Sequence, residues 1–206
     1  VAVVYLLARA ARGGSNITML LAGVAVSFFF SSMILFLQYI SDLTRTFRMV
    51  RWVMGGLDSV VGLDSVLTML PFVFAGSAVV LYLRHELNLI ATGEELAAAR
   101  GVEVDRVKLV LFAACSVMVG AIVSVCGPIG FVGLMAPHIV RTLMGADNRF
   151  LIPGSAVFGA VLLLLSDIIA RTIVAPTMLP VGVVTACLGG PLFMYLILRD
   201  SKEVWS

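Results

Sequence analysis

The chain has 206 residues, of which 61% are hydrophobic and only 13% are charged, and its mean hydropathy is +1.10. This small number of charges could not cover the surface of a soluble domain of this size. The composition therefore excludes a soluble globular protein and indicates a multi-pass membrane protein. The net charge of +2 and the scattered Lys and Arg residues argue against nucleic acid as a partner.

Apolar runs define the predicted fold class, an all-α bundle of transmembrane helices. Val1 is not a start Met and 1–8 reads as the end of a span, so we expect the chain to be a fragment that lacks its N-terminal part. Uncharged runs predict about six membrane segments at 17–40, 65–83, 109–126, 131–143 (short), 150–170 and 181–198. The break between the third and fourth falls at Gly127-Pro128-Ile129-Gly130, because proline and glycine disfavour helical continuation.

Two connections between these segments carry most of the charge. In 42–64, Arg45, Arg48 and Arg51 recur every three residues, which predicts a short amphipathic helix at the outer membrane surface or a solvated turn. The polar island 91–108 has acids at its start, alanines in its middle and Arg100-Gly101 at its end, which predicts another short helix.

The basic residues orient the chain. With 91–108 in the cytoplasm, ten of the fourteen lie inside and four outside, as the positive-inside rule requires, and the C-terminus is cytoplasmic. The inside set is Arg9, Arg12, Arg84, Arg100, Arg106, Lys108, Arg141, Arg149, Arg199 and Lys202, and the outside set is Arg45, Arg48, Arg51 and Arg171.

Few residues suggest chemistry. The chain has no GxxxxGK[ST] phosphate loop and no metal-ligand spacing, and we expect Cys115, Cys126 and Cys187 to be buried small apolar residues. Asp167 and Arg171 are four apart, so on a helix they can form an ion pair. Three functions remain open: a permease energised by another subunit, an ion-coupled secondary transporter, and a polytopic membrane enzyme.

Seven motifs then follow one another along nearly the whole chain. They are Leu20–Ala25, Trp52–Gly56, Gly127–Arg141, Leu151–Gly154, Ser166–Arg171, Leu179–Ala186 and Gly189–Phe193. Together they resemble the FecCD-type permeases of iron-siderophore, haem and cobalamin ABC importers. In the longest motif, the structural signature is carried by Gly127, Pro128, Gly130, Gly133, Pro137, His138 and Arg141.

The resemblance implies a type II ABC importer permease of the cell membrane, with about ten spans per subunit. It implies a non-enzymatic translocation subunit that moves a metal chelate by alternating access, with no metal or cofactor on this chain. Its implied partners are membrane lipid, a second permease copy, two ATPase subunits that carry ATP and Mg, and an extracytoplasmic substrate-binding protein.

The same resemblance suggests roles for individual residues. The ATPase-coupling segment would comprise Thr92, Gly93, Glu94, Glu95, Leu96, Ala97, Ala98, Ala99, Arg100, Gly101 and Val102. Arg171 matches an arginine that docks the binding protein, a role that competes with its pairing to Asp167. Ser15 and Asn16 fall where the family has an inner gate.

Overall fold

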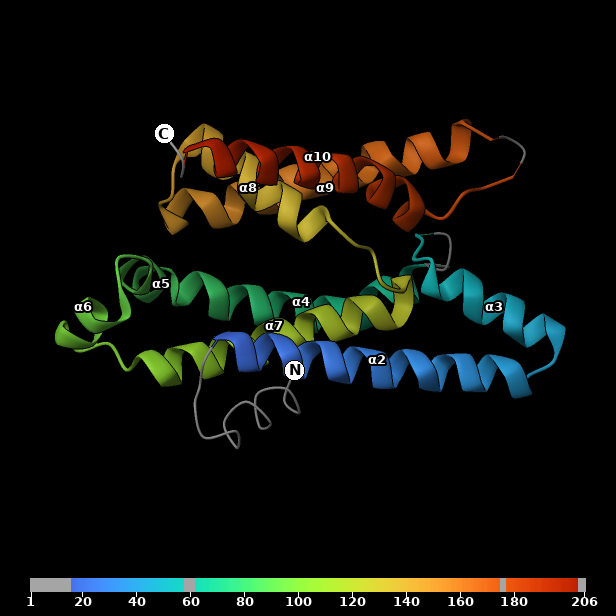
Figure 1. Ribbon diagram of the computed structural model, residues 1–206, viewed down its shortest axis with the longest axis horizontal. Helices are drawn as coiled ribbons and strands as arrows, with labels where there is room; N and C mark the ends of the chain where they lie inside the picture. The colour runs from blue at the N-terminus through green and yellow to red at the C-terminus, as the bar shows by residue number, and fades with distance from the viewer. Residues whose placement is uncertain (1–15, 58–61, 175–176, 204–206) are drawn as a thin grey trace. The chain divides into compact units, whose positions relative to one another are not determined.

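A computed structural model describes residues 16–57, 62–174 and 177–203, and the regular secondary structure in these ranges is helical. The chain divides into two units after Val50. The helices are α2 (Asn16–Ile40), α3 (Leu43–Val53), α4 (Leu63–Tyr82), α5 (Arg84–Ala91), α6 (Glu94–Ala99), α7 (Val104–Cys126), α8 (Val132–Met144), α9 (Asn148–Thr172) and α10 (Val181–Glu203) (Figure 1).

The first unit is dominated by α2, a helix of 25 residues with no charged side chain. At 1.5 Å per residue it is about 37 Å long, enough to cross the hydrocarbon core of a bilayer. From Leu20 onward its large apolar side chains are mostly exposed, among them Phe28 and Tyr39. A helix that is apolar on all sides requires lipid or other helices around it. Asp42 lies between α2 and α3, and its carboxylate accepts a hydrogen bond from the Arg45 backbone N–H at 3.0 Å.

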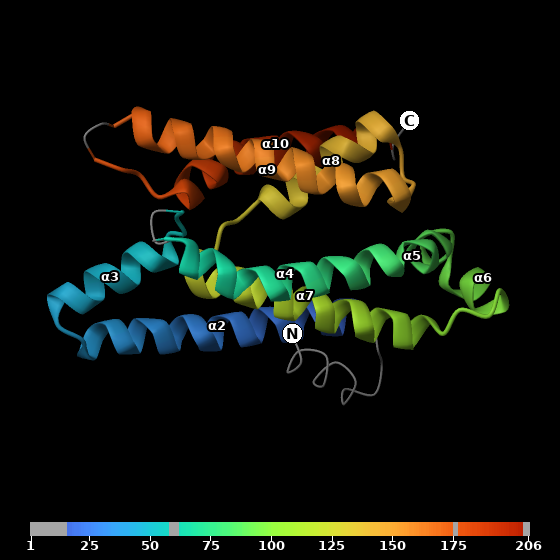
Figure 2. The same cartoon turned by 180° about the vertical axis from the view of Figure 1, so that it is seen from behind.

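The second unit contains two groups of packed helices, which Figures 1 and 2 show from opposite sides. In the first group α4 packs along α7, and α5 and α6 connect the two. Gly76 lets these helices approach closely, because a Cβ built there would lie 2.9 Å from the Met118 Cβ. In the second group α8 and α10 both pack on α9. Hereafter these are the α4–α7 group and the α8–α10 group.

The buried core lies where α9 and α10 meet, around Ala170, Val181 and Val184. Two polar side chains are buried with hydrogen bonds to backbone carbonyls, as buried polar groups generally are. The Ser166 hydroxyl donates to the Leu162 carbonyl at 2.8 Å. The Thr185 hydroxyl donates to the carbonyl of Gly182 at 3.1 Å.

Four of the described helices, α2, α4, α7 and α9, are long and apolar enough to cross a membrane, while α8 and the first part of α10 are shorter apolar helices. The break predicted at 127–130 is confirmed, because α7 ends at Cys126 and α8 begins at Val132. The helix that contains the third predicted segment, 109–126, begins earlier, at Val104. The charged residues 105, 106 and 108 lie within its first turns, and a criterion based on uncharged runs cannot include them.

Candidate functional site

The predicted short helix in the polar island exists as α6, and its end is defined by hydrogen bonds. The Gly101 N–H donates to the Ala98 carbonyl at 2.9 Å, and the Val102 N–H donates to the Ala97 carbonyl at 3.1 Å. These two bonds form a Schellman motif, which requires a left-handed residue at the position after the cap. Gly101 occupies that position with φ +84°. The Arg100-Gly101 stop signal was therefore read correctly from the sequence.

One side of α6 is fixed to the rest of the unit. Ala97 is fully buried. The Lys108 ammonium lies 2.7 Å from a Glu94 carboxylate oxygen, so an ion pair ties the start of α6 to the first turns of α7. The other side is exposed and carries Leu96, which is 60% exposed. The exposed residues around it are Glu95, Ala98, Ala99 and Arg100. A helix held on one side and carrying an exposed leucine on the other is suited to contact a partner.

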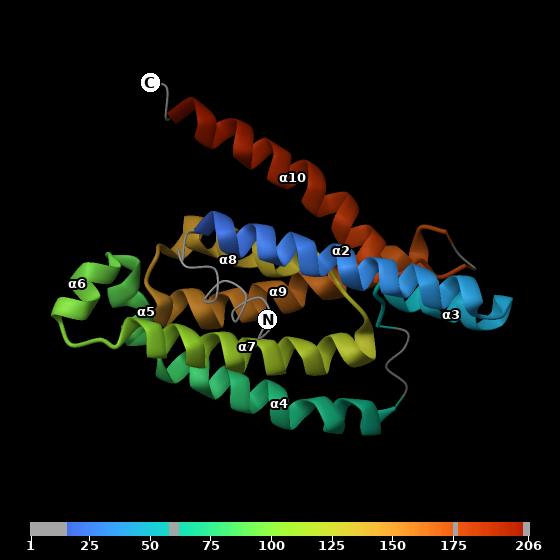
Figure 3. The ribbon, with the colours of Figure 1, turned by 60° about the horizontal axis from the view of Figure 1, so that its bottom comes forward.

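The helix α5, which immediately precedes this segment, was not predicted. It is amphipathic and short, with no apolar run that marks it in the sequence. Its C-terminal residue is followed by Thr92, whose hydroxyl donates to the Leu89 carbonyl at 2.7 Å. Figure 3 shows α5 and α6 together at one end of the second unit, which we call the coupling end.

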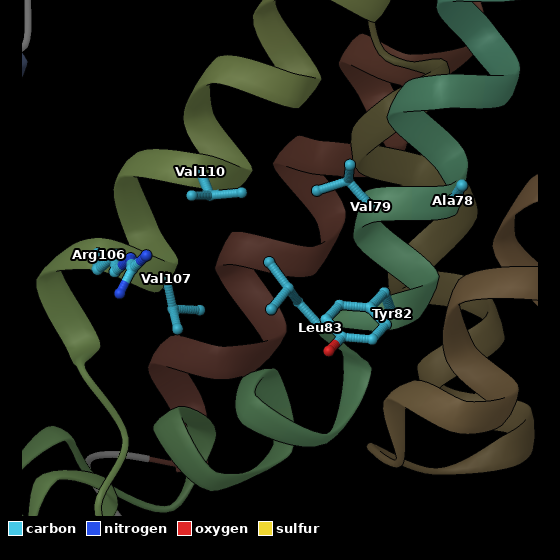
Figure 4. Close-up of a pocket in the computed structure, with 7 residues that line it drawn as sticks. All are labelled: Ala78, Val79, Tyr82, Leu83, Arg106, Val107 and Val110. Atoms are coloured by element: carbon cyan, nitrogen blue, oxygen red, sulfur yellow. The ribbon is translucent and has the colours of Figure 1, made fainter.

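A groove of about 560 Å³ opens between α4 and α7 near the coupling end. Figure 4 shows Val79 and Leu83 on one wall and Val107 and Val110 on the other. Its charged lining residue, Arg106, lies 3.3 Å from Glu103 in an exposed ion pair. The groove is otherwise almost wholly apolar, as expected of helix surfaces that face lipid or another helix.

A polar contact that no sequence pattern predicted joins α5 to the start of α9. The Asn88 side-chain amide donates to the Asp147 carboxylate at 2.8 Å. The Asn88 oxygen accepts from the backbone N–H of Asn148 at 2.9 Å and from its side-chain amide at 2.8 Å. Asp147 also caps α9 by accepting from the Arg149 N–H at 2.9 Å. The Arg149 N–H, followed by the Asn88 amide, lowers the pKa of Asp147 below its usual range.

At the opposite end of the second unit, three glycines from distant segments meet. A Cβ on Gly55 would lie 2.2 Å from the Pro128 carbonyl oxygen, and one on Gly127 would lie 2.1 Å from the Trp52 carbonyl oxygen. A Cβ on Gly182 would lie 2.1 Å from the Met54 carbonyl oxygen. We call Gly55, Gly127 and Gly182 the glycine node.

Backbone hydrogen bonds hold the glycine node together. The Gly56 N–H donates to the Cys126 carbonyl at 2.8 Å, and the Gly182 N–H donates to the Gly55 carbonyl at 3.0 Å. The approach is therefore backbone against backbone, and no side chain larger than hydrogen fits between the segments.

The predicted signature 127–141 is divided between different environments. Gly127 belongs to the node, whereas a Cβ on Gly130 or Gly133 would meet nothing within 4 Å among the described residues. Pro137 lies inside α8, and His138 and Arg141 are exposed on it.

Phe131, which the sequence did not single out, precedes α8 with φ +65° although it is not a glycine. Its ring lies edge-on to that of Phe193 on α10, with centroids 6.5 Å apart. A Cβ on Gly189 would lie 2.3 Å from the Phe131 Cβ, so α10 packs tightly over this strained residue. No local sequence pattern predicts a phenylalanine in the left-handed conformation, because the conformation of Phe131 depends on this packing.

The predicted ion pair in α9 is confirmed, since the Arg171 Nε lies 2.7 Å from an Asp167 carboxylate oxygen.

Cys126 is buried as predicted, but Cys187 is exposed in the described chain, so that part of the cysteine prediction is wrong. Asn16 begins α2, and Ser15 lies outside the described residues. Within the described ranges, no group of three or more His, Cys, Asp or Glu side chains could hold a metal ion.

These features define a polytopic, all-helical membrane protein, and its motifs place it in a transport family. A model of the FecCD transport family matches residues 1–199, and the chain belongs to that family.

Individual relatives agree with this assignment. The chain is 40% identical over 190 residues to the hemin transport system permease protein HmuU of Yersinia pestis, covering 92% of this chain and 57% of that protein. It is 42% identical over 200 residues to the cobalamin import system permease protein BtuC of Halobacterium salinarum, covering 97% and 53%. The chain thus spans little more than half the length of these curated relatives.

A solved structure shows the same fold. It is an inward-facing conformation of a metal-chelate type ABC transporter, with a TM-score of 0.84 and 32% sequence identity over 96% of this chain and 63% of that chain. The predicted fold class, a type II ABC importer permease, is confirmed by this similarity.

Proposed function

We propose that this chain is the membrane-spanning part of an ABC importer permease that moves a metal chelate across the cell membrane by alternating access. The observation that carries the proposal is α6, a short helix fixed on one side and exposed on the other, in a member of the FecCD transport family. Energy is supplied by a separate ATPase that binds ATP and Mg. Chelates of the haem, siderophore or cobalamin class are the substrates that the relatives' names support.

The coupling segment 92–102 is the surface that the ATPase contacts on the cytoplasmic side. Leu96 supplies exposed apolar area at its centre, and Glu95 and Arg100 supply charges on either side. Movement of the ATPase is transmitted through this rigid helix to the membrane helices. A second permease copy completes the pathway within the lipid bilayer.

The binding protein docks at the end of the second unit opposite α6, where Arg171 is exposed near the end of α9. Arg171 already pairs with Asp167, so docking has to exchange one carboxylate partner for another. Such an exchange is feasible because the Arg171 side chain is 45% exposed and can therefore meet a second carboxylate from outside.

The test uses the complete permease reconstituted with its partner ATPase. Leu96→Arg should abolish co-purification of the ATPase and ATP-dependent uptake, because it places a charge at the centre of the contact. The matched control is Leu63→Arg. Leu63 is a leucine that is 78% exposed, at the start of α4 and away from α6.

Normal ATPase assembly and uptake in the Leu96→Arg variant would overturn the coupling role of α6. Uptake that persists without ATP and collapses with an ion gradient would instead identify a secondary transporter. Turnover of a substrate by the permease without its ATPase would identify a membrane enzyme.

A further inference from the structure

The two helix groups of the second unit are joined at both of its ends by very different contacts. At one end the glycine node brings the segment after α3, the connection after α7 and the start of α10 together through their backbones. At the coupling end, α5 packs against α9, which is the principal contact between helices of the two groups among the described residues. Movement imposed on α5 and α6 therefore reaches the α8–α10 group directly through the contact of α5 with α9.

Within that contact, the side chain of Asn88 forms hydrogen bonds with Asp147 and Asn148. We call these hydrogen bonds the Asn88 contact. Three hydrogen bonds of 2.8 to 2.9 Å use both the donor and the acceptor of the Asn88 amide. They bridge residues 59 and 60 positions apart in the chain. Since hydrogen bonds depend on direction as well as distance, this arrangement fixes the orientation of α5 relative to the first turn of α9.

The N-terminus of α9 is a rigid point at which to receive such a contact. Asp147 accepts both the Arg149 backbone N–H and the Asn88 amide on the same oxygen, so the helix cap and the contact with α5 share one atom. A displacement of Asn88 thus acts on the end of a 25-residue helix rather than on a mobile loop. The far end of α9 leads to the start of α10, since the Leu179 N–H donates to the Ala170 carbonyl at 3.2 Å.

We propose that Asn88 is a positioning residue for transport, which passes the movement of the coupling segment from the α4–α7 group to the α8–α10 group through Asp147 and Asn148. This inference rests on the proposed importer function and adds to it the route within the permease. Movement of α6 alone would displace α7, which follows it directly, and α4, to which it is connected through α5. With the Asn88 contact, the α8–α10 group moves as well, about the backbone contacts of the glycine node.

A carboxylate exchange tests the contact itself. Asn88→Asp removes the amide donor and places a second carboxylate against Asp147, so the two groups repel each other. We expect ATP-dependent uptake to fall by about ten-fold or more, the effect of losing one charged hydrogen bond. ATPase co-purification and ATP hydrolysis should persist, because the exposed face of α6 is unchanged.

The reversed pair is the decisive variant. Asn88→Asp combined with Asp147→Asn gives the new amide at 147 a carboxylate partner at 88, while the amide oxygen at 147 can still cap α9. Uptake should return close to that of the parent. Asp147→Asn alone keeps a hydrogen bond from the Asn88 amide to the new amide oxygen and introduces no repulsion, so uptake should fall less than in Asn88→Asp. Unchanged uptake in Asn88→Asp, or no recovery in the reversed pair, would overturn the proposal.

A covalent bridge tests the same contact without depending on the folding of Asn88→Asp. Asn88→Cys with Asn148→Cys, in a Cys187→Ser background because Cys187 is exposed, should support uptake when the cysteines are oxidised with copper phenanthroline and lose it on reduction. Uptake blocked by oxidation would mean that α5 and α9 must separate, and the proposal would fail. The importer function is tested separately, because its failure would abolish ATP-dependent uptake in the parent permease as well.

Discussion

The glycine node and the coupling end hold the same two helix groups together, yet they do so by opposite means. In the node, backbone lies against backbone, and the segments are fixed by the absence of side chains at Gly55, Gly127 and Gly182. At the coupling end, the Asn88 side chain joins α5 to the start of α9 through hydrogen bonds, while the ion pair of Glu94 with Lys108 ties α6 to α7 within the α4–α7 group. The backbone packing of the node tolerates no side chain at its three contact points, whereas the contact at the coupling end depends on the chemistry of the side chains that form it. Substitutions at the two ends should therefore act by different means, through steric overlap in the node and through lost or repelling polar groups at the coupling end.

Among substitutions that test the difference between the two ends, Gly182→Ala is expected to lower the stability of the folded protein most. The new Cβ would lie 2.1 Å from the Met54 carbonyl oxygen, and no flexible side chain can move away. We expect a loss of more than about 3 kcal/mol in the free energy of unfolding, the upper range for overpacking. Thermal unfolding of the detergent-solubilised permease measures it.

Gly120→Ala is the matched control for that substitution, because Gly120 is also helical and a Cβ there meets nothing within 4 Å. It should be neutral or stabilising by about 0.5 kcal/mol, since alanine is the better helix former. Equal effects of the two substitutions would contradict the node.

A smaller effect is expected from Gly101→Ala at the coupling end. Gly101 has φ +84° but open space around its Cα, so only backbone strain opposes a side chain. The cost should be about 1 kcal/mol. Gly101→Asn should cost less because asparagine tolerates the left-handed conformation. Thermal unfolding in detergent again measures both, and a loss as large as that of Gly182→Ala would remove the contrast between the two ends.

The ion pair of Glu94 with Lys108 should contribute less still. Both side chains are partly exposed, so a double-mutant cycle with Glu94→Gln and Lys108→Met should give about 0.5 kcal/mol. The interaction should weaken with added salt, because exposed charges are screened. A coupling energy that does not respond to salt would indicate a pair buried by a partner surface.

The smallest effect concerns pH. The pKa of Asp147 is lowered, so its carboxylate stabilises the folded chain above the ordinary pKa of about 4, and this contribution is lost as pH falls through the lowered value. Asp147→Asn should therefore be less stable than the parent at neutral pH, and the difference should shrink below about pH 4. Melting temperatures of both proteins across that range provide the test, and a difference that grows on acidification would contradict it.

The sequence predicted the elements that depend on local rules. Apolar runs located the long helices within a few residues, and the acid-rich start and Arg100-Gly101 end of 91–108 located α6. The i, i+4 spacing located the Asp167–Arg171 pair. Helix α5 was not predicted, because its eight residues form no apolar run. The start of α7 was not predicted either, because charged residues lie in its first turns.

By itself, the sequence determined the membrane class, the all-helical fold and, through its motifs, the FecCD transport family, because these depend on composition and on short-range periodicity. Only the tertiary structure decided at which glycines a side chain would overlap a neighbouring segment, and which residues Asn88 contacts. Gly133 and Gly182 look alike in sequence, but one has open space and the other meets a backbone from residue 54. Asn88 and Asp147 are 59 residues apart, and no local pattern pairs them. Contacts of that range depend on how helices pack, a property of the whole unit rather than of any segment.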